Sequence, residues 1–268
     1  MSDRYATLFA RLEPSGAAAL IPFVTLGDPD LVGSARVLDA LVDAGVDALE
    51  LGIPFSDPVA DGPVLQAAAA RALAHGVRVS ECFGLVRRAR NRAPGMPIGL
   101  LVYANTVFAR GIDAFYRDAA AAGVDSVLVA DVPLDEGAPF DTAAAQAGIA
   151  AIYIAAPNLT TTRAAELAAR TRGYTYVTSR PGVTGERGPR ADVTLERRIA
   201  ALRTAGAPPA VVGFGISTAD DTRHAVAAGA RGVIVGSALV QRIADEGSVP
   251  AGYLRDLVAA TRSRAVVA

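Results

Sequence analysis

Two carboxylates, Glu50 and Asp61, are the side chains of this sequence best placed to do chemistry. Glu50 lies inside a short segment, 47–51, that has the pattern of a buried strand, and Asp61 lies on the segment that follows it. A carboxylate buried as an unpaired anion costs several kcal/mol, so burial raises its pKa towards neutrality, where it can both donate and accept a proton. Two carboxylates in different surroundings can then divide proton transfer and charge stabilisation between them.

Each of these acidic residues also has a purely structural interpretation. Glu50 could be satisfied by neighbouring backbone groups or by an arginine. Asp61 precedes Gly62-Pro63, a setting typical of a helix N-cap. Asp131 follows another expected strand, 126–129, and is more typical of a turn. The pattern alone leaves both interpretations of Asp61 open.

The residue types that are missing narrow the chemistry further. All 26 basic residues are arginines, so the chain lacks lysine. A Schiff-base aldolase, a pyridoxal enzyme and a P-loop NTPase each need a lysine, so these classes are excluded. The two histidines, His75 and His224, lie far apart without metal-ligand spacing, Cys82 is the only cysteine, and no Gly-x-Ser-x-Gly motif occurs. We therefore expect carboxylate catalysis, helped by a tyrosine, with no metal or cofactor bound by this chain.

The composition is that of a globular protein, with 51% hydrophobic and 20% charged residues in a chain of 268. The net charge of -1 gives no field that would attract nucleic acid or an anionic membrane. No apolar run approaches the roughly 20 residues that span a bilayer, and residues 1–13 lack a signal-peptide core. We expect a cytoplasmic protein that binds neither nucleic acid nor membrane.

The elements that must position the carboxylates follow a repeat of amphipathic stretch, glycine and short apolar run. A glycine just past a helix ends it, because it enters the left-handed region without a Cβ clash. The glycines are Gly16, Gly45, Gly95, Gly123, Gly148, Gly173, Gly206 and Gly229. The runs fit strands of a parallel sheet buried on both faces, and they cover 20–24, 47–51, 98–102, 126–129, 151–154, 174–178, 210–213 and 232–235. Eight such units in about 250 residues predict a single-domain α/β fold over residues 1–268, a (β/α)₈ TIM barrel with extra helices between Gly45 and Gly95.

An open, doubly wound sheet is the alternative fold. It should carry a Gly-x-Gly-x-x-Gly motif after its first strand, and Gly27-Asp28-Pro29 does not match that motif. The closed barrel is therefore favoured.

Small residues after the last two expected strands predict a phosphate site. Gly215 follows 210–213, and Gly236-Ser237 follows 232–235. Backbone N–H groups at such helix N-termini can surround a phosphate, and barrels commonly bind phosphate at these two positions. The glycine-rich segment 179–188 has few apolar anchors and is predicted to be a lid that excludes water, with an ordinary loop as the alternative.

These motifs together make the chain resemble the tryptophan synthase α-subunit family over nearly its whole length. The segments that carry the resemblance are 22–29 (PFVTLGDP), 49–58 (LELGIPFSDP), 60–63 (ADGP), 103–105 (YAN), 129–133 (VADVP), 182–185 (GVTG) and 213–217 (GFGIS). The resemblance implies cleavage of indole-3-glycerol phosphate to indole and glyceraldehyde 3-phosphate. This is a retro-aldol step of tryptophan biosynthesis that uses no cofactor.

The resemblance also implies roles for particular residues. Glu50 matches the acid/base that protonates the indole ring, and Asp61 matches the carboxylate that holds the indole N–H. Substrate contacts are implied for Phe23, Leu101, Leu128, Tyr176, Thr184, Gly185, Gly215, Gly236 and Ser237. The first three would serve equally well as barrel core. Tyr176 is implied to contact the glycerol hydroxyls, and Thr184 to reach Asp61 when the lid closes.

A partner subunit is implied as well. In the resemblance the α subunit passes indole to a β subunit that carries pyridoxal phosphate, in an α2β2 heterotetramer, and segment 54–61 supplies much of the interface. Pro54, Phe55 and Asp57 are the contacts that we expect, and exposed proline and phenylalanine side chains would suit a docking surface.

Three competing functions remain at this point. The chain could be a free-standing indole-3-glycerol phosphate lyase, a non-catalytic regulatory barrel, or another phosphate-binding barrel enzyme. The related indole-glycerol phosphate synthase reaction relies on lysine, which is absent here. Small residues at Ala155-Ala156 and a proline at Pro181 depart from common family forms, and they put the behaviour of the loops in question rather than the reaction.

Overall fold

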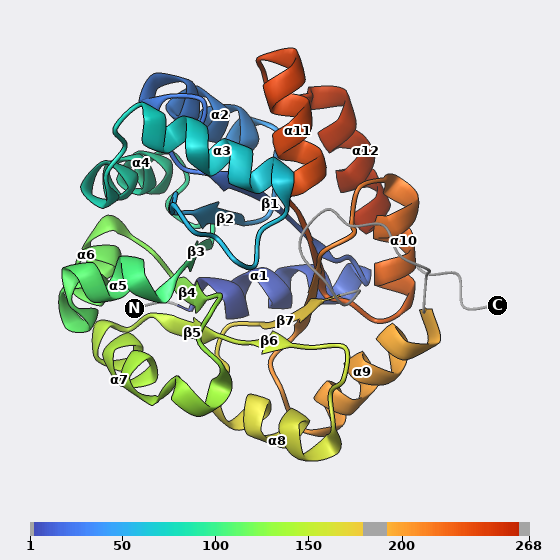
Figure 1. The fold of residues 1–268 in the computed structure, drawn as a ribbon. Coiled ribbons are helices and arrows are strands. Elements are labelled where there is room, and N and C mark those ends of the chain that lie inside the picture. Colours follow the sequence, from blue (N-terminus) through green and yellow to red (C-terminus); the bar gives the residue numbers. More distant parts are fainter. Residues whose placement is uncertain (1–2, 179–191, 263–268) are drawn as a thin grey trace.

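The computed structural model describes residues 3–178 and 192–262. Its nine strands pair in parallel in the order β5-β4-β3-β2-β1-β9-β8-β7-β6. The two ends of this order, β5 and β6, are consecutive pieces of one stretch of chain, so the sheet curves round into the predicted TIM barrel (Figure 1). The strands are β1 Ala19–Thr25, β2 Leu49–Gly52, β3 Ile98–Val102, β4 Ser126–Val129, β5 Ala150–Ile152, β6 Ile154–Ala155, β7 Thr175–Thr178, β8 Ala210–Gly213 and β9 Gly232–Val235.

Four of the expected strands have the predicted bounds, and the others differ for physical reasons. The expected strand 151–154 is divided into β5 and β6 at Tyr153, because β5 pairs with β4 whereas β6 pairs with β7. The expected strand 47–51 begins only at Leu49. Asp47 instead accepts a hydrogen bond from the Leu20 amide (2.9 Å) and lies against two arginines.

Helices surround the barrel (Figure 1). They are α1 Arg4–Leu12, α2 Leu31–Asp43, α3 Pro63–Ala74, α4 Val79–Arg92, α5 Ala104–Arg110, α6 Ile112–Ala122, α7 Ala138–Ala147, α8 Thr161–Arg170, α9 Asp192–Thr204, α10 Ala219–Ala227, α11 Ser237–Glu246 and α12 Ala251–Arg262, with short 3₁₀ turns at Glu13–Ser15 and Leu134–Glu136. α3 and α4 are the extra helices expected between Gly45 and Gly95. In the described residues, no helix is long and apolar enough to cross a membrane.

Most of the glycines predicted to end helices have a positive φ, as Gly123 (φ 93°) and Gly148 (φ 68°) illustrate. The prediction for Gly95 is wrong. α4 ends at Arg92, and Ala93 caps it with φ -135°, so the left-handed conformation is not needed there.

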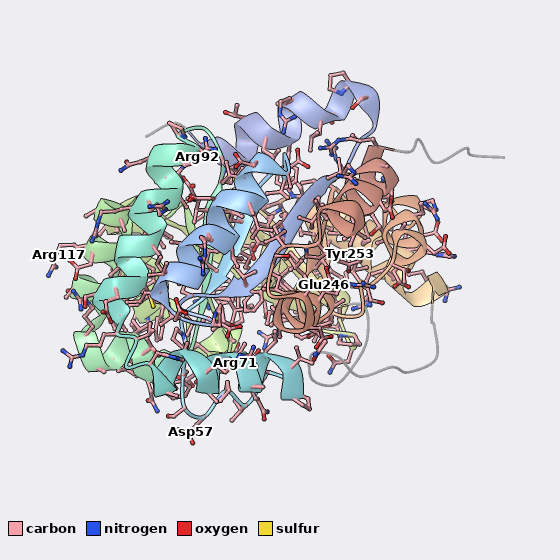
Figure 2. All side chains as sticks on the ribbon, turned by 90° about the horizontal axis from the view of Figure 1, so that it is seen from above. Asp57, Arg71, Arg92, Arg117, Glu246 and Tyr253 are labelled. Atoms are coloured by element: carbon pink, nitrogen blue, oxygen red, sulfur yellow. The ribbon has the colours of Figure 1, made fainter. Side chains whose placement is uncertain are left out.

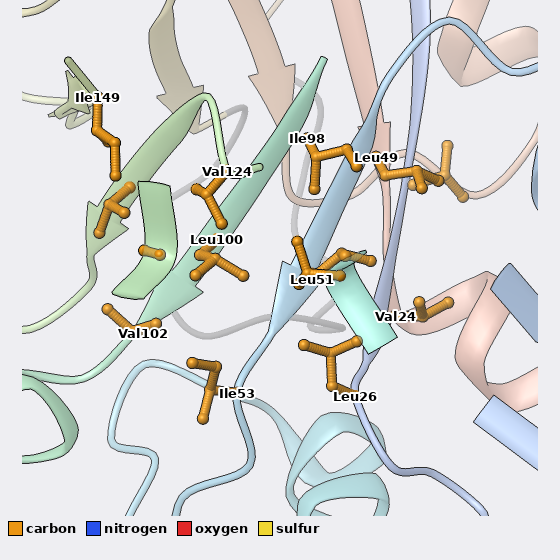
Figure 3. Close-up of a cluster of buried hydrophobic side chains, with 14 of the residues drawn as sticks. Val24, Leu26, Leu49, Leu51, Ile53, Ile98, Leu100, Val102, Val124 and Ile149 are labelled. Atoms are coloured by element: carbon orange, nitrogen blue, oxygen red, sulfur yellow. The ribbon is translucent and has the colours of Figure 1, made fainter. Parts of the chain in front are cut away.

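The side chains of each strand divide between two hydrophobic clusters. One cluster lies between the strands and the surrounding helices and includes Leu49 and Leu51, which Figure 3 shows on β2. The other fills the barrel interior and includes Phe23 and Tyr176. Because side chains alternate along a strand, Glu50, between Leu49 and Leu51, faces the barrel interior.

Candidate active site

A cavity of about 740 Å³ opens at the carboxyl ends of the strands. Its walls bring together five side chains expected from the sequence, namely Phe23, Glu50, Asp61, Leu101 and Tyr176. This is the end of a barrel where active sites form, because the strand ends and the loops after them converge there. A cavity of this volume suits a small-molecule substrate.

Glu50 is buried at the floor of this cavity and has 2% of its surface exposed. The Tyr174 hydroxyl donates a hydrogen bond to Oε1 (2.8 Å). Oε2 has no hydrogen-bond partner among the residues that the structure describes. Burial raises the pKa of Glu50 to about 7, the Tyr174 hydrogen bond opposes this rise, and the nearby Asp61 charge adds to it. Glu50 can therefore exchange a proton near neutral pH.

Asp61 lies on the loop after β2, where its own amide donates to the Pro58 carbonyl (3.0 Å). Burial raises its pKa to about 6, and a hydrogen bond from the Tyr103 hydroxyl lowers it. The interpretation of Asp61 as a helix N-cap is wrong, since Gly62 occupies the N-cap position of α3. The Asp61 side chain lines the cavity instead.

Two glycines make room for the aromatic walls. A Cβ on Gly52 would lie 2.6 Å from the Phe23 ring, and a Cβ on Gly213 would lie 2.0 Å from the Tyr176 hydroxyl. Neither distance is possible for a real side chain, so larger residues at these positions would displace the rings. The two glycines therefore determine where the Phe23 and Tyr176 rings lie in the cavity wall.

The two leucines expected to form cavity walls differ. Leu101 lines the cavity, whereas Leu128 is not among its lining residues. Leu128 pairs with Leu101 in the β3–β4 register and is 1% exposed within the interior cluster. Leu128 therefore packs beside Leu101 in the barrel interior.

Gly215, Gly236 and Ser237 also line this cavity, just after β8 and β9, where phosphate was expected. The two helix N-termini there differ. At α10, Asp221 Oδ2 accepts hydrogen bonds from the amides of Ser217 (3.1 Å) and Thr218 (3.0 Å), so these donors are already used. At α11, the N-cap Gly236 provides no side-chain cap. The first amides of α11 are therefore the better donors for a bound phosphate.

A strained residue also marks this end of the site. Phe214 has a positive φ of 63° although it is not glycine, and its ring packs edge-on against Tyr176 with 5.8 Å between centroids. Positive φ in a bulky residue costs free energy and is common at functional sites. Phe214 lines the cavity next to Gly215.

Some expected site residues cannot be placed. Thr184, Gly185 and the whole expected lid 179–188 lie outside the described residues. Their predicted contacts with substrate and with Asp61 stay predictions.

The expected partner surface after β2 is only partly exposed. Pro54 and Pro58 are buried, and Phe55 is half-buried with its ring stacked on Tyr103 (5.3 Å between centroids). The expectation of exposed proline and phenylalanine side chains is therefore wrong. The exposed residues of this loop are Ser56, Asp57, which Figure 2 shows at the outer edge of the molecule, and Val59, which is 72% exposed.

Sequence reasoning missed the tyrosines that hold the two carboxylates, Tyr174 for Glu50 and Tyr103 for Asp61. Tyr174 lies two residues before the expected site residue Tyr176, so both side chains point into the barrel, and that spacing was a usable signal. Tyr103 entered the sequence analysis only as part of a motif. Asp131 lies in a turn, as expected, and its side chain accepts a hydrogen bond from the Ala104 amide at the start of α5 (2.8 Å). In the described residues, no group of three His, Cys, Asp or Glu side chains could hold a metal.

The chain is similar to known proteins over most of its length. A family model described as tryptophan synthase alpha chain matches residues 9–266. The chain is 52% identical over 241 residues to the tryptophan synthase alpha chain of Shewanella amazonensis, covering 90% of each chain. It is 51% identical over 255 residues to that of Serratia proteamaculans, covering 95% of each. Among solved structures, it superposes on a chain of Mycobacterium tuberculosis tryptophan synthase with a TM-score of 0.89 and 32% identity, covering 98% of this chain and 100% of that one.

Proposed function

Because this chain belongs to the tryptophan synthase alpha chain family, we propose that Glu50 and Asp61 carry out the retro-aldol cleavage of indole-3-glycerol phosphate. The observation that carries the proposal is that both carboxylates, with raised pKa values, line one cavity of about 740 Å³ that an uncapped helix N-terminus also lines. The products are indole and glyceraldehyde 3-phosphate, and the enzyme is a carbon–carbon lyase.

Glu50 performs the proton transfers in this proposal. Its protonated carboxyl gives a proton to the ring carbon that bears the glycerol chain, which turns the ring into an electron sink. The side-chain hydroxyl then loses its proton as it becomes the aldehyde. The carbon–carbon bond breaks, and its electron pair returns to the ring, so the net change moves one proton from oxygen to carbon. A group with a pKa of about 7 can serve both steps.

Asp61 stabilises the charge that forms on the ring. In its ionised form it accepts the indole N–H and faces the cationic tautomer, for which it provides the counter-charge. Its pKa of about 6 lies below that of Glu50, so at neutral pH Asp61 is mostly ionised while Glu50 is still partly protonated. The two carboxylates can thus hold the protonation states that the mechanism needs.

The remaining contacts orient the substrate. The N-terminus of α11 offers amide donors at Ser237 to the phosphate, and Tyr176, which lines the same cavity, contacts the glycerol hydroxyls. Phe23 and Leu101 enclose the flat indole ring. Holding the two ends of the substrate fixes the bond to be cleaved beside Glu50.

The partner of this chain is a tryptophan synthase β subunit, which would carry pyridoxal phosphate and receive the indole in an α2β2 assembly. Asp57 and Val59 support this proposal, because they are exposed on the same loop that carries Asp61. Binding of the β subunit to this loop would then be able to shift the position of the Asp61 carboxylate. A cytoplasmic location stays our prediction from the sequence.

The test is release of indole from indole-3-glycerol phosphate, measured with and without the β subunit. We expect slow release from the chain alone and a sharp rise when the partner is added. Fast release that the partner does not change would show a free-standing lyase. No release in either case would overturn the proposal and leave a phosphate-binding barrel of unknown substrate.

A further inference from the structure

A second cavity, of about 580 Å³, lies beside the first. It is lined by residues that follow β4, by β5 and β6, and by α8. Two residues, Ala130 and Ile154, line both cavities. They therefore form the wall between the substrate site and a space that the mechanism does not use.

The wall stands at a seam in the barrel. β4 pairs with β5 only as far as Leu128 opposite Ile152. Above that point the chain turns away, and β6 pairs with β7 instead, with Ile154 opposite Tyr176. In the described residues, the pairings of β4, β5 and β6 do not join Ala130 to Ile154, and Figure 1 shows these strands next to one another at this seam. Side chains, rather than backbone hydrogen bonds, separate the two cavities here.

The chemistry of the second cavity favours apolar occupants near the wall. Leu128 and Ile152, at its inner end, belong to the same interior cluster as Phe23 and Tyr176 of the substrate site. Arg163, at its outer end, is bound by Asp135 (2.9 Å) and by Glu166 (2.9 Å). Because two carboxylates already surround this guanidinium, an anionic occupant gains little there.

From this arrangement we propose that Ile154, with Ala130, determines which substituted indole rings the site accepts. Shortening Ile154 would join the two cavities and let a small apolar ring substituent occupy the second one. The inference rests on the proposed function, because it takes the indole ring to be the part of the substrate that meets this wall. The side chain of Ile154 is the larger part of the wall, since Ala130 has only a methyl group.

The test uses the reverse reaction, condensation of an indole with glyceraldehyde 3-phosphate by the full-length chain. A bond forms between the ring carbon and the aldehyde carbon, and the ring proton ends on the new hydroxyl. Indole itself and the 4-, 5-, 6- and 7-methylindoles are compared as substrates. For the parent chain we expect about 10- to 200-fold discrimination against the methylindole whose methyl group meets the wall, as one misplaced carbon in an apolar pocket typically gives.

The variant Ile154→Ala should raise the rate for that methylindole, relative to indole, at least tenfold. Ile154→Val should give a smaller gain in the same direction, and it keeps the test available if the alanine variant does not fold. The matched control is Ile234→Ala. Ile234 lines the first cavity but not the second, so the same truncation there should leave the preference among methylindoles unchanged.

A second substitution checks where the methyl group goes. Ala156 lines only the second cavity, so the double variant Ile154→Ala/Ala156→Phe should lose the gain. Equal gains from Ile154→Ala and Ile234→Ala, or no gain with any methylindole, would overturn the inference. Failure of the parent chain to condense even unsubstituted indole would instead contradict the proposed function, so the two failures are distinct.

Discussion

The barrel buries carboxylates at both ends, and the groups that meet them differ. At the amino ends of the strands, guanidinium nitrogens of Arg11 and Arg262 each lie 2.8 Å from a carboxylate oxygen of Asp47. The carboxylate oxygens of Asp125 lie 2.7 Å from Arg4 and 2.5 Å from Arg90. At the carboxyl ends, Glu50 and Asp61 meet tyrosine hydroxyls instead, and their pKa values rise to about 7 and about 6.

The comparison shows that burial alone does not make a carboxylate catalytic. An arginine partner compensates the charge and ties distant segments together, as Arg262 of the last helix does for Asp47 ahead of β2. A tyrosine partner leaves most of the desolvation cost in place, so the group keeps a proton near neutral pH. The carboxylates at one end should therefore matter for stability and those at the other for catalysis.

The largest effect should come from replacing Glu50. Glu50→Gln keeps the shape of the side chain but removes the proton transfer, so we expect kcat for indole release to fall about 10²–10⁴-fold. Steady-state kinetics of the complex with the β subunit measures this loss, and binding of indole-3-glycerol phosphate should persist. A variant with nearly normal turnover would remove Glu50 from the mechanism.

The same substitution should change how stability depends on pH. The folded-state pKa of Glu50 is about 7, above the ordinary glutamate value of 4.5. Between these values the folded state holds more protons than the unfolded state, so the free energy of unfolding of the parent falls as pH rises through this window. Glu50→Gln should remove that part of the slope, which amounts to at most about 3 kcal/mol. Urea unfolding at pH 5 and pH 8 would measure it, and equal differences at both pH values would contradict it.

At the opposite end, Asp47→Asn should act on stability alone. The amide cannot satisfy both arginines and the Leu20 N–H as the carboxylate does, so we expect a loss of about 1–3 kcal/mol in the free energy of unfolding. Denaturant unfolding measures this loss. Turnover per folded molecule should stay within about twofold of the parent, and a large loss of kcat without loss of stability would break the contrast between the two ends.

Much of this arrangement follows from local sequence rules. The apolar runs and the glycines after helices predicted the barrel, and alternation along β2 turned Glu50 inward because Leu49 and Leu51 pack against the helices. The pattern indicated Glu50 and Asp61 as acid/base candidates, and only their particular roles toward the indole ring came from the family resemblance.

What the sequence could not supply depends on contacts between distant residues. The Tyr174 hydroxyl reaches Glu50 across 124 residues of chain. The burial of Pro54 and the break between β5 and β6 depend likewise on how neighbouring loops and strands pack. Our preference for α11 over α10 as the phosphate-binding helix rests on which of the two N-termini is capped by a side chain of its own. The hydrogen bonds that decide this are seen only in the structure.

The smallest effect, and the finest test of the comparison, concerns the tyrosine partner of Glu50. The Tyr174 hydrogen bond lowers the pKa of Glu50, so Tyr174→Phe should raise it, by roughly one unit for a hydrogen bond worth about 1.5 kcal/mol. The proposed mechanism requires ionised Asp61 and protonated Glu50, so kcat/KM should rise with pH through the pKa of Asp61 and fall through that of Glu50. In the variant the falling limb should move to higher pH while the rising limb stays in place.

Tyr5→Phe is the matched control, because the Tyr5 ring packs 5.3 Å from that of Tyr174 but its hydroxyl is hydrogen-bonded to Ser126. If both variants shift the falling limb equally, the interior packing rather than the Tyr174 hydroxyl sets the protonation of Glu50. A shift confined to Tyr174→Phe would show that a neutral hydroxyl tunes the carboxylate at this end of the barrel, where arginines hold the carboxylates at the other.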